Sequence, residues 1–448
     1  MDLTNDILPL DLPLANSSII KVIGVGGGGG NAVNHMYSQG IADVTFVLCN
    51  TDIQDLEGSS VPIKVQLGKE STEGLGAGGK PEVAAKAAEE SVEEIKNMLA
   101  DNTKMVFITA GMGGGTGTGA SPVIAKTASE MGILTVGIVT IPFAFEGKPK
   151  ITQALKGVAR LSQHVDALLI INNEKLKLIY PDLELSNAFA KADDILSNAA
   201  RAIAEIITVP GYINIDFADV NTIMRGGKVA IMNTGYAEGE NRISKAIDDA
   251  LNSPLLNTND VHGASKVLLS LYCSTQNQIK MEEISQIHDF MAEVGEDVTV
   301  IWGASFDDTL GDKVKITLIA TGFDVKDIPG MPEDLLEEEL PSTEVAEGED
   351  SYEAENMSSV MKQAETKKAN DEKIEKAMSA FYGDSVKTQK PVENTEAETF
   401  METIPFEIEE ETTEEEDIPT IDIDDLEDDE YLNKMKKEPA WKRKLLRK

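Results

Sequence analysis

Apolar and polar positions along the N-terminal part of the chain predict a parallel sheet covered by helices. The apolar runs are continuous, and amphipathic segments separate them. Strands that are buried on both faces have this pattern. The predicted strands are Ser18–Val25, Val44–Cys49, Met105–Thr109, Ile133–Ile141 and Ala167–Ile171. The predicted helices are a segment capped by Asn31 that ends at Gly40, then Pro81–Leu99, Ser121–Glu130 and Ile151–His164.

The pattern changes after one long predicted helix, Asn187–Ile207, which Pro210 and Gly211 terminate. Beyond it, we expect a second, smaller α/β domain with a mixed sheet. Its predicted strands are Lys228–Asn233, Lys266–Cys273, Val298–Trp302 and Lys313–Ala320. Its predicted helices are Arg242–Leu251 and Glu282–Val294. The fold class is therefore α/β, with the long helix between two domains.

Charge is distributed very unevenly along the chain. The formal net charge is -38, and residues 331–430 alone hold 35 acidic and 7 basic side chains. Such a segment buries too little apolar surface to offset its conformational entropy, so 326–430 is predicted to be a disordered acidic linker. Residues 431–448 are basic instead, and Trp441, Leu445 and Leu446 would share one helical face. This end is typical of a docking peptide for a partner or a membrane surface.

Composition narrows the classes of function. The large negative charge disfavours a nucleic-acid binder, because phosphates would be repelled. Residues 1–18 are predicted to be flexible and lack the basic and apolar regions of a secretory signal. No run approaches the ~20 apolar residues that span a bilayer. Cys49 and Cys273 lie in apolar runs and are predicted to be buried, inert thiols. We therefore expect a cytoplasmic protein.

Two glycine loops each follow a predicted strand and precede a predicted helix. The first is Gly24–Asn31, and the second is Ala110–Gly119. Glycine lets a backbone approach phosphate closely, and the start of a helix offers free amides. Two such loops at the carboxyl ends of parallel strands can hold one polyphosphate from two sides. A third glycine run, Gly74–Gly79, could close over the terminal phosphate.

Five motifs together resemble the FtsZ family of tubulin-like GTPases. They are IKVIGVGGGGGNAVNHM at Ile20–Met36, NTD at Asn50–Asp52, GLGAG at Gly74–Gly78, GGGTGTG at Gly113–Gly119 and NIDFADV at Asn214–Val220. The resemblance covers about Ile19–Gly322. It implies a tubulin-like fold with a Rossmann-like GTP-binding domain at 19–185, a central helix at 186–210 and a C-terminal activation domain at 211–325.

The resemblance also implies a set of residues that bind GTP or GDP. Ribose contacts fall on Glu146 and Lys150, and base recognition falls on Asp193, with Phe189 stacking on the base. The family usually has arginine where this chain has Lys150, which keeps the charge but lacks the planar fork of arginine. The phosphate contacts fall on Gly27, Gly28, Gly29, Gly30, Asn31, Thr116, Gly117 and Thr118. Gly78, Gly114 and Gly115 are further nucleotide-binding positions.

The acidic segment 214–219 is the candidate catalytic element. Asp216 and Asp219 are three residues apart, so they can share one face of a helix. Taken alone, they are more typical of acids that offset a helix dipole. In the family this loop enters the nucleotide pocket of the next subunit, which implies that Asn214, Asp216 and Asp219 orient water and Mg²⁺ against the γ-phosphate.

The same resemblance predicts the assembly and the partners. It implies a head-to-tail homopolymer that forms the cytokinetic ring scaffold at midcell, on the inner face of the cytoplasmic membrane. Pro439, Ala440 and Trp441 resemble a docking motif for a membrane-tethering adaptor and other ring regulators. Contact of residues 442–448 with anionic lipid is a further hypothesis.

Three alternatives stay open on the sequence. The G-x-G-x-x-G match at Gly24–Gly29 would suit an NAD-dependent oxidoreductase, although that match alone is weak. A non-catalytic filament protein of the same fold is the second alternative, and a tubulin-like filament that segregates DNA is the third.

Overall fold

The computed structural model describes residues 18–324, except for 42, 181, 183, 252–262 and 296–297. The predicted flexible start, the acidic linker and the basic docking peptide therefore lie outside the described residues, apart from Ser18.

The described strands form one sheet of ten strands in the order β3-β2-β1-β4-β5-β6-β7-β10-β8-β9. The first six in sequence are β1 (Ile20–Val25), β2 (Thr45–Asn50), β3 (Ile63–Gln66), β4 (Met105–Gly111), β5 (Leu134–Ile141) and β6 (Ala167–Asn172). They are followed by β7 (Lys228–Ala237), β8 (Lys266–Cys273), β9 (Thr299–Phe306) and β10 (Val314–Phe323).

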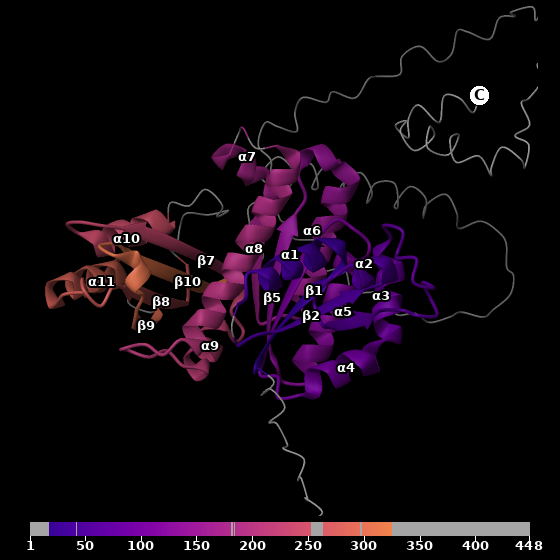
Figure 1. The fold of residues 1–448 in the computed structure, drawn as a ribbon, viewed down its shortest axis with the longest axis horizontal. Helices are drawn as coiled ribbons and strands as arrows, with labels where there is room; N and C mark the ends of the chain where they lie inside the picture. The colour runs from indigo at the N-terminus through magenta and orange to yellow at the C-terminus, as the bar shows by residue number, and fades with distance from the viewer. Residues whose placement is uncertain are drawn as a thin grey trace, which may run out of the picture. The chain divides into compact units, whose positions relative to one another are not determined.

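Helices cover both faces of this sheet (Figure 1). Those of the first part are α1 (Gly26–Ser38), α2 (Ile53–Glu57), α3 (Pro81–Glu90), α4 (Val92–Ala100), α5 (Thr116–Glu130), α6 (Lys148–Ser162) and α7 (Leu176–Ile179). The long helix is α8 (Leu185–Thr208), followed by α9 (Phe217–Met224), α10 (Arg242–Leu251) and α11 (Met281–Val294). Short 3₁₀ turns are η1 (Ala144–Glu146), η2 (Asn173–Lys175) and η3 (Asp308–Leu310).

The sheet is parallel in its first part and mixed in its second. Strands β1 to β6 run parallel to their neighbours, whereas β10 is antiparallel to both β7 and β8. The mixed sheet was predicted for the second part, and it continues the sheet of the first part. The two parts of the sheet are joined by β6 and β7. The join is narrow, because it consists of two residue pairs, Ala167 with Lys228 and Leu168 with Val229.

The alternation of side chains along each strand divides the core into two layers. In β1, Ile23 and Val25 belong to one layer, whereas Ile20 and Val22 belong to the other. The first layer includes residues of α3 to α6, and the second includes residues of α1, α8 and α9. Buried β-branched and aliphatic side chains on both faces explain why the apolar runs are continuous in sequence.

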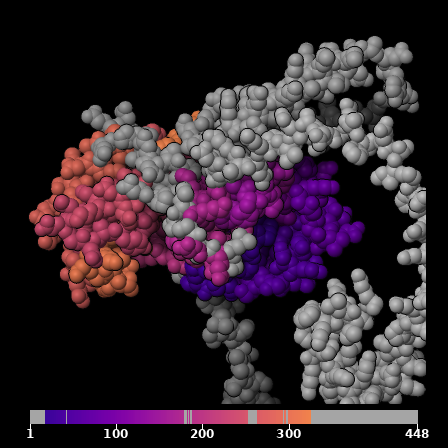
Figure 2. Space-filling view, turned by 90° about the horizontal axis from the view of Figure 1, so that it is seen from above, coloured from indigo at the N-terminus to yellow at the C-terminus, as the bar shows by residue number. Residues whose placement is uncertain are grey.

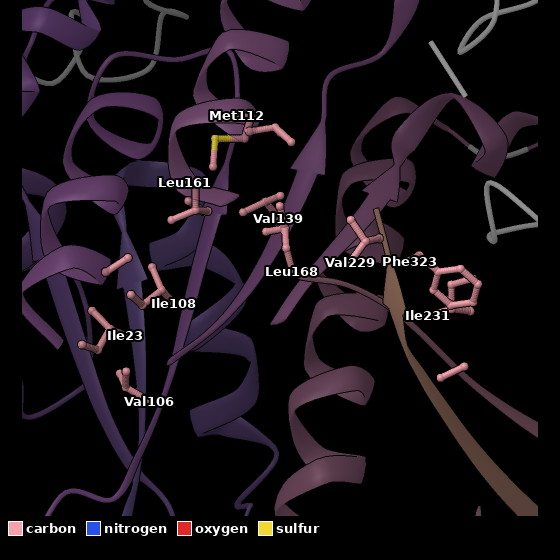
Figure 3. Packing of buried hydrophobic residues seen from close by; sticks show 14 of the residues in the cluster. Ile23, Val106, Ile108, Met112, Val139, Leu161, Leu168, Val229, Ile231 and Phe323 are labelled. Atoms are coloured by element: carbon pink, nitrogen blue, oxygen red, sulfur yellow. The ribbon is translucent and has the colours of Figure 1, made fainter. Parts of the chain in front are cut away.

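The first core layer extends through both parts of the fold. Figure 3 shows it passing from Ile23 through Leu168 to Val229 and Phe323, which lie on strands of both parts. In the space-filling view, magenta residues lie between the indigo N-terminal part and the orange C-terminal part (Figure 2).

The start of α1 was predicted wrongly. Asn31 is not its cap, since α1 begins at Gly26 and the glycines form its first turns. Glycine is a poor helix former, but close packing requires it here. A Cβ atom on Gly29 would lie 2.2 Å from the carbonyl oxygen of Thr109 in β4.

The single helix predicted at Pro81–Leu99 is two helices, which meet at Ser91. The Ser91 hydroxyl accepts a hydrogen bond of 2.9 Å from the backbone N–H of Gly68. A serine that bonds outside its own helix favours a break at this position.

Candidate functional site

The two predicted glycine loops pack directly against each other at the carboxyl ends of β1 and β4. A Cβ atom on Gly26 would lie 2.8 Å from the backbone nitrogen of Gly117. One on Gly28 would lie 3.3 Å from the Cα atom of Gly111. The loops therefore meet backbone to backbone, as the sequence predicts for a two-sided phosphate clamp.

Each loop leads into the N-terminus of a helix that is suited to an anion. Neither α1 nor α5 has an acidic residue in its first turn or a side chain that caps it. Their first amides are thus left for an external acceptor, at the positive end of the helix dipole. A Cβ atom on Gly30 or Gly114 would meet no heavy atom of the described chain within 4 Å. Open space therefore lies beside both loops.

The third glycine run lies against the second loop. A Cβ atom on Gly115 would lie 3.0 Å from the backbone nitrogen of Lys80, just after this run. The run is anchored near its start, where the backbone N–H of Ile53 donates to the carbonyl of Gly74 at 3.1 Å. Gly78 has a φ of 57° and open space at its Cβ position within the described part of the chain. These contacts bring the three glycine segments together.

The two threonines of the second loop both make hydrogen bonds within the described chain. The Thr118 hydroxyl is buried and accepts a hydrogen bond of 2.9 Å from the backbone N–H of Gly113. The Thr116 hydroxyl lies 2.8 Å from that of Thr51, after β2. Thr118 thus shapes the loop, and contact of either hydroxyl with phosphate stays a prediction.

Glu146, the last residue of η1, lies next to Lys150 in the first turn of α6. One carboxylate oxygen of Glu146 accepts from the backbone N–H of Phe143 at 2.9 Å, and the other accepts from Lys150 Nζ at 3.1 Å. The lysine side chain is 55% exposed, so its ammonium group can turn toward a ligand.

Phe189 and Asp193 lie one turn apart on α8. The Phe189 ring packs edge-on against Phe143, with ring centroids 5.3 Å apart. Burial raises the pKa of Asp193 to about 6, with an opposing effect from His35 and a smaller raising effect from Asp194. The carboxylate is therefore poorly solvated in the free chain, and N–H donors from a ligand would stabilise it.

A polar contact between α1 and α8 was not found from the sequence. His35 Nε2 lies 2.7 Å from a carboxylate oxygen of Asp194, and Lys191 Nζ lies 3.2 Å from the other. Burial by itself would raise the pKa of Asp194. The hydrogen bonds from Lys191 and His35 outweigh this effect and keep the pKa of Asp194 below its ordinary value. The pair connects α1, which begins in the first glycine loop, to the helix of Asp193.

Two more residues of this region carried no signal in the sequence. Gln153 on α6 donates from Nε2 to the carbonyls of Gly114 at 2.9 Å and of Gly79 and Gly113 at 3.2 Å. Asn173, which follows β6, is buried, and its Oδ1 atom has no hydrogen-bond partner in the described part of the chain. Buried amide oxygens in proteins normally accept a hydrogen bond, so this atom is available to a water molecule or a ligand.

The acidic segment lies beyond the other end of α8. Asp216 caps α9, with its carboxylate accepting from the backbone N–H of Asp219 at 3.0 Å, and Asp219 returns the same bond to Asp216. The side-chain oxygen of Asn214 accepts from the backbone N–H of Gly211 at 3.1 Å. The dipole-compensating role that the sequence allowed is thus present in the isolated chain.

The structure does not bring this segment to the glycine loops. The part of α8 between Asp193 and Thr208 alone spans about 22 Å at 1.5 Å per residue. Figure 1 shows α8 running from the side of α7 to α9. One chain therefore holds the two halves of the predicted site far apart.

The described residues contain neither a helix long and apolar enough to cross a membrane nor a cluster of three or more acidic, histidine or cysteine side chains that could hold a metal. Cys49 and Cys273 are both buried, as predicted, and burial raises the pKa of Cys49 to about 12.

Two family models match most of the described chain. Residues 19–181 match the GTPase domain of the Tubulin/FtsZ family, and residues 228–324 match the C-terminal domain of the FtsZ family. A cell division protein FtsZ of Porphyromonas gingivalis is 57% identical over 308 residues, which are 68% of this chain and 67% of the relative. One of Aquifex aeolicus is 45% identical over 69% of this chain and 84% of the relative.

Solved structures agree with this assignment. An FtsZ dimer from M. jannaschii is 42% identical, with a TM-score of 0.62 over 68% of this chain and 88% of that one. CetZ2 from Haloferax volcanii, at 20% identity and a TM-score of 0.59 over 71% of this chain and 96% of that one, shares the fold. These findings decide against the oxidoreductase, the non-catalytic filament and the DNA-segregating filament. The chain belongs to the FtsZ family, the tubulin-like GTPases of cell division.

Proposed function

We propose that this GTPase assembles head to tail and that the acidic segment of one copy completes the nucleotide site of the next. The separation along α8 is the observation that carries the proposal. The first glycine loop lies toward the start of α8, because His35 of α1 contacts Asp194 and Gln39, which follows α1, contacts Arg201 further along α8. Asn214, Asp216 and Asp219 follow the other end of α8. A site that needs both sets therefore needs two copies.

In this proposal the nucleotide lies across the carboxyl edge of the parallel strands. The first amides of α1 and α5 bind the phosphates, with Gly30 and Gly114 beside the open space. Glu146 and Lys150 bind the ribose. Asp193 accepts two N–H bonds from the guanine edge, which adenine cannot supply.

The acidic segment supplies the catalytic groups. The reciprocal cap uses one carboxylate oxygen of Asp216 and one of Asp219, which leaves the other oxygen of each for a neighbouring copy. Asn214 uses its side-chain oxygen within its own loop, so its amide N–H groups can face outward. These groups would orient the attacking water in line with the γ-phosphate, where hydrolysis depends mainly on positioning.

The donor set suits a Mg²⁺ ion that arrives with the nucleotide. The described residues hold no cluster of three or more ligating side chains, and nucleotide-bound Mg²⁺ needs only one or two carboxylates besides phosphates and water. Asp216 and Asp219 would provide these carboxylates. When bound, the ion offsets the repulsion between carboxylates and phosphates.

Exposed apolar side chains at both ends support a head-to-tail contact. Leu75, in the third glycine run, is 80% exposed, and Ile53 lies beside it at 40%. Tyr212, beside the acidic segment, is also 80% exposed, and its ring lies 6.2 Å from that of Phe306. A contact between two different surfaces that does not close generates a filament. The 42% identical structure from M. jannaschii is that of an FtsZ dimer.

The C-terminal segments lie outside the described residues. In this proposal they determine where in the cell the filaments attach. We propose that Pro439, Ala440 and Trp441 bind a membrane-tethering adaptor and ring regulators at midcell, on the inner face of the cytoplasmic membrane. Direct contact of residues 442–448 with anionic lipid is tested by liposome sedimentation after deletion of 441–448. Unchanged binding would remove the lipid hypothesis.

The decisive experiment measures phosphate release from GTP against protein concentration, with Mg²⁺. We expect almost no release below a threshold and a linear rise above it. Mixing Asp193→Ala, which impairs the pocket, with Asp219→Asn, which impairs the acidic segment, is the matched control. The mixture should be more active than either variant alone, because some contacts pair an intact pocket with an intact segment. Constant activity per molecule at all concentrations would refute assembly of the site from two copies.

A further inference from the structure

Gln153 joins two of the three glycine segments through one side chain. Its half-buried amide lies on α6 and donates to Gly114 at 2.9 Å and to Gly79 at 3.2 Å. The carbonyl of Gly113 is a third acceptor at 3.2 Å. An amide group has two hydrogens, so these three carbonyls share them. The second loop and the end of the third run are thus held by the same donor.

The position of Gln153 is itself well determined. One turn earlier on α6, the backbone packs closely on the second loop, since a Cβ atom on Gly113 would lie 2.9 Å from the carbonyl oxygen of Lys150. Gly113 also has a φ of 99°, which side chains other than glycine rarely adopt. The Gln153 amide therefore belongs to a helix whose first turn packs closely on the second loop.

The third glycine run depends on contacts at its ends. Near its start, the carbonyl of Gly74 accepts from Ile53, and the N–H of Gly76 donates to the carbonyl of Thr51 at 3.3 Å. Near its end, Gly79 has a φ of 75° and accepts from Gln153. Glycines with positive φ give the run conformational freedom, so the bond to Gly79 restricts where its end can lie.

We propose that Gln153 is a positioning residue that holds the third glycine run against the second loop, in the geometry that encloses the terminal phosphate. This inference rests on the proposed placement of the nucleotide between these loops. Gln153 acts through the two backbones and does not touch the reacting atoms. Its loss should affect a nucleotide with a γ-phosphate more than one without it.

The test compares the dissociation rates of a slowly hydrolysed GTP analogue and of GDP, at protein concentrations below the assembly threshold. Gln153→Met keeps the length of the side chain but removes the donor. It should speed release of the GTP analogue about fivefold, the effect of about one lost hydrogen bond, and change GDP release less than twofold. Gln153→Glu should have a larger effect, because it places a carboxylate against three carbonyl oxygens. Gln163→Met, an exposed position at the end of the same helix, is the control.

Hydrogen exchange keeps the proposal falsifiable if the variants are less stable. Without nucleotide, amides of 74–79 should exchange faster in Gln153→Met than in wild type, whereas those of β4 should not. Equal acceleration of GTP-analogue and GDP release, or unchanged exchange at 74–79, would overturn the positioning role. Failure of the wild-type protein to bind either nucleotide would instead refute the proposed site.

Discussion

Asp216 and Asp219 cap each other at the start of α9, with each carboxylate accepting the backbone N–H of the other at 3.0 Å. The two acids proposed to act on a neighbouring copy thus also stabilise their own helix. A substitution that removes both the helix cap and the carboxylate cannot separate the two functions. A substitution that keeps the cap but removes the carboxylate can.

Asp216→Ser should separate the cap from catalysis. Serine caps helices about as well as aspartate, whereas alanine at this position costs about 1 kcal/mol. We expect Asp216→Ala to lower the free energy of unfolding by about that amount and Asp216→Ser to lower it much less. Both should lose GTP hydrolysis equally. Urea unfolding and phosphate release measure the two effects, and wild-type turnover in Asp216→Ser would exclude a catalytic role.

Asp219→Ala should bind GTP normally, because Asp219 lies far from the glycine loops of its own chain. Its filaments should persist longer than those of wild type, since hydrolysis would no longer weaken the contact. Light scattering after a limited GTP addition measures their lifetime. Asp219→Asn, which retains a side-chain acceptor for the cap, is the control for helix stability. Wild-type turnover in both variants would contradict the assignment.

Asp193 should make guanine-nucleotide affinity depend on pH. In the free chain its pKa is about 6 rather than 3.8, so its carboxyl binds a proton more readily than in the unfolded chain. Between these values this group makes the folded protein less stable as the pH rises. Guanine N–H donors favour the carboxylate, so binding releases the proton, and affinity should fall as the pH drops below about 6.

The measurement for Asp193 is a GDP titration between pH 5 and 8. Asp193→Asn keeps one acceptor and cannot ionise. Its affinity for GDP should therefore be lower than that of wild type and should not show the fall below about pH 6 that Asp193 causes. Protonation of the nucleotide itself affects binding to both proteins equally, so it cancels in the ratio of their GDP affinities. A ratio independent of pH would show that the Asp193 carboxyl does not contact the base.

Gly29 and Gly30 are adjacent but should respond oppositely to alanine. A Cβ atom at Gly29 would lie 2.2 Å from the Thr109 carbonyl, and one at Gly30 would enter open space. Gly29→Ala should lower the free energy of unfolding by about 1–3 kcal/mol. Gly30→Ala should fold as well as wild type, because alanine favours helix, but should bind nucleotide more weakly. Normal nucleotide affinity in Gly30→Ala would show that the phosphates do not bind beside Gly30.

Lys150 should matter for nucleotide binding and little for stability. Its ion pair with Glu146 is largely exposed on the lysine side, and such pairs contribute about 0–1 kcal/mol. Lys150→Ala should therefore unfold near the wild-type urea concentration but bind GDP more weakly. Lys150→Arg should bind at least as tightly as wild type, because it restores a planar fork. Equal GDP affinity in wild type, Lys150→Ala and Lys150→Arg would show that Lys150 does not contact the nucleotide.

The elements that the sequence predicted well are those whose signal is local. Continuous apolar runs located the strands other than β3, and glycines after β1 and β4 located the two loops that pack together. The short β3 carries no continuous apolar run and was missed. The break at Ser91 and the helical glycines after Gly26 were missed because they depend on distant backbone, at Gly68 and Thr109. The join of β6 to β7 was missed because residues 173–227 separate the two strands.

The candidate site divides in the same way. Local motifs pointed to the glycine loops and the acidic segment, and the family resemblance pointed to Asp193. Gln153 and the His35–Asp194 pair carry no such motif, because each acts only through partners far along the chain. Long-range contacts of ordinary polar residues have no local pattern to detect.

The narrow join between β6 and β7 bears on how the chain can fold during synthesis. All strands from β1 to β6 precede residue 173, and all strands from β7 onward follow residue 227. The ribosome adds about 5–20 residues per second, so the first six strands emerge seconds before the seventh. Because only two residue pairs join the two parts of the sheet, the first part can complete its own pairing during that interval. The order of translation thus favours a nucleotide-binding half that is in place before the half that carries the acidic segment is complete.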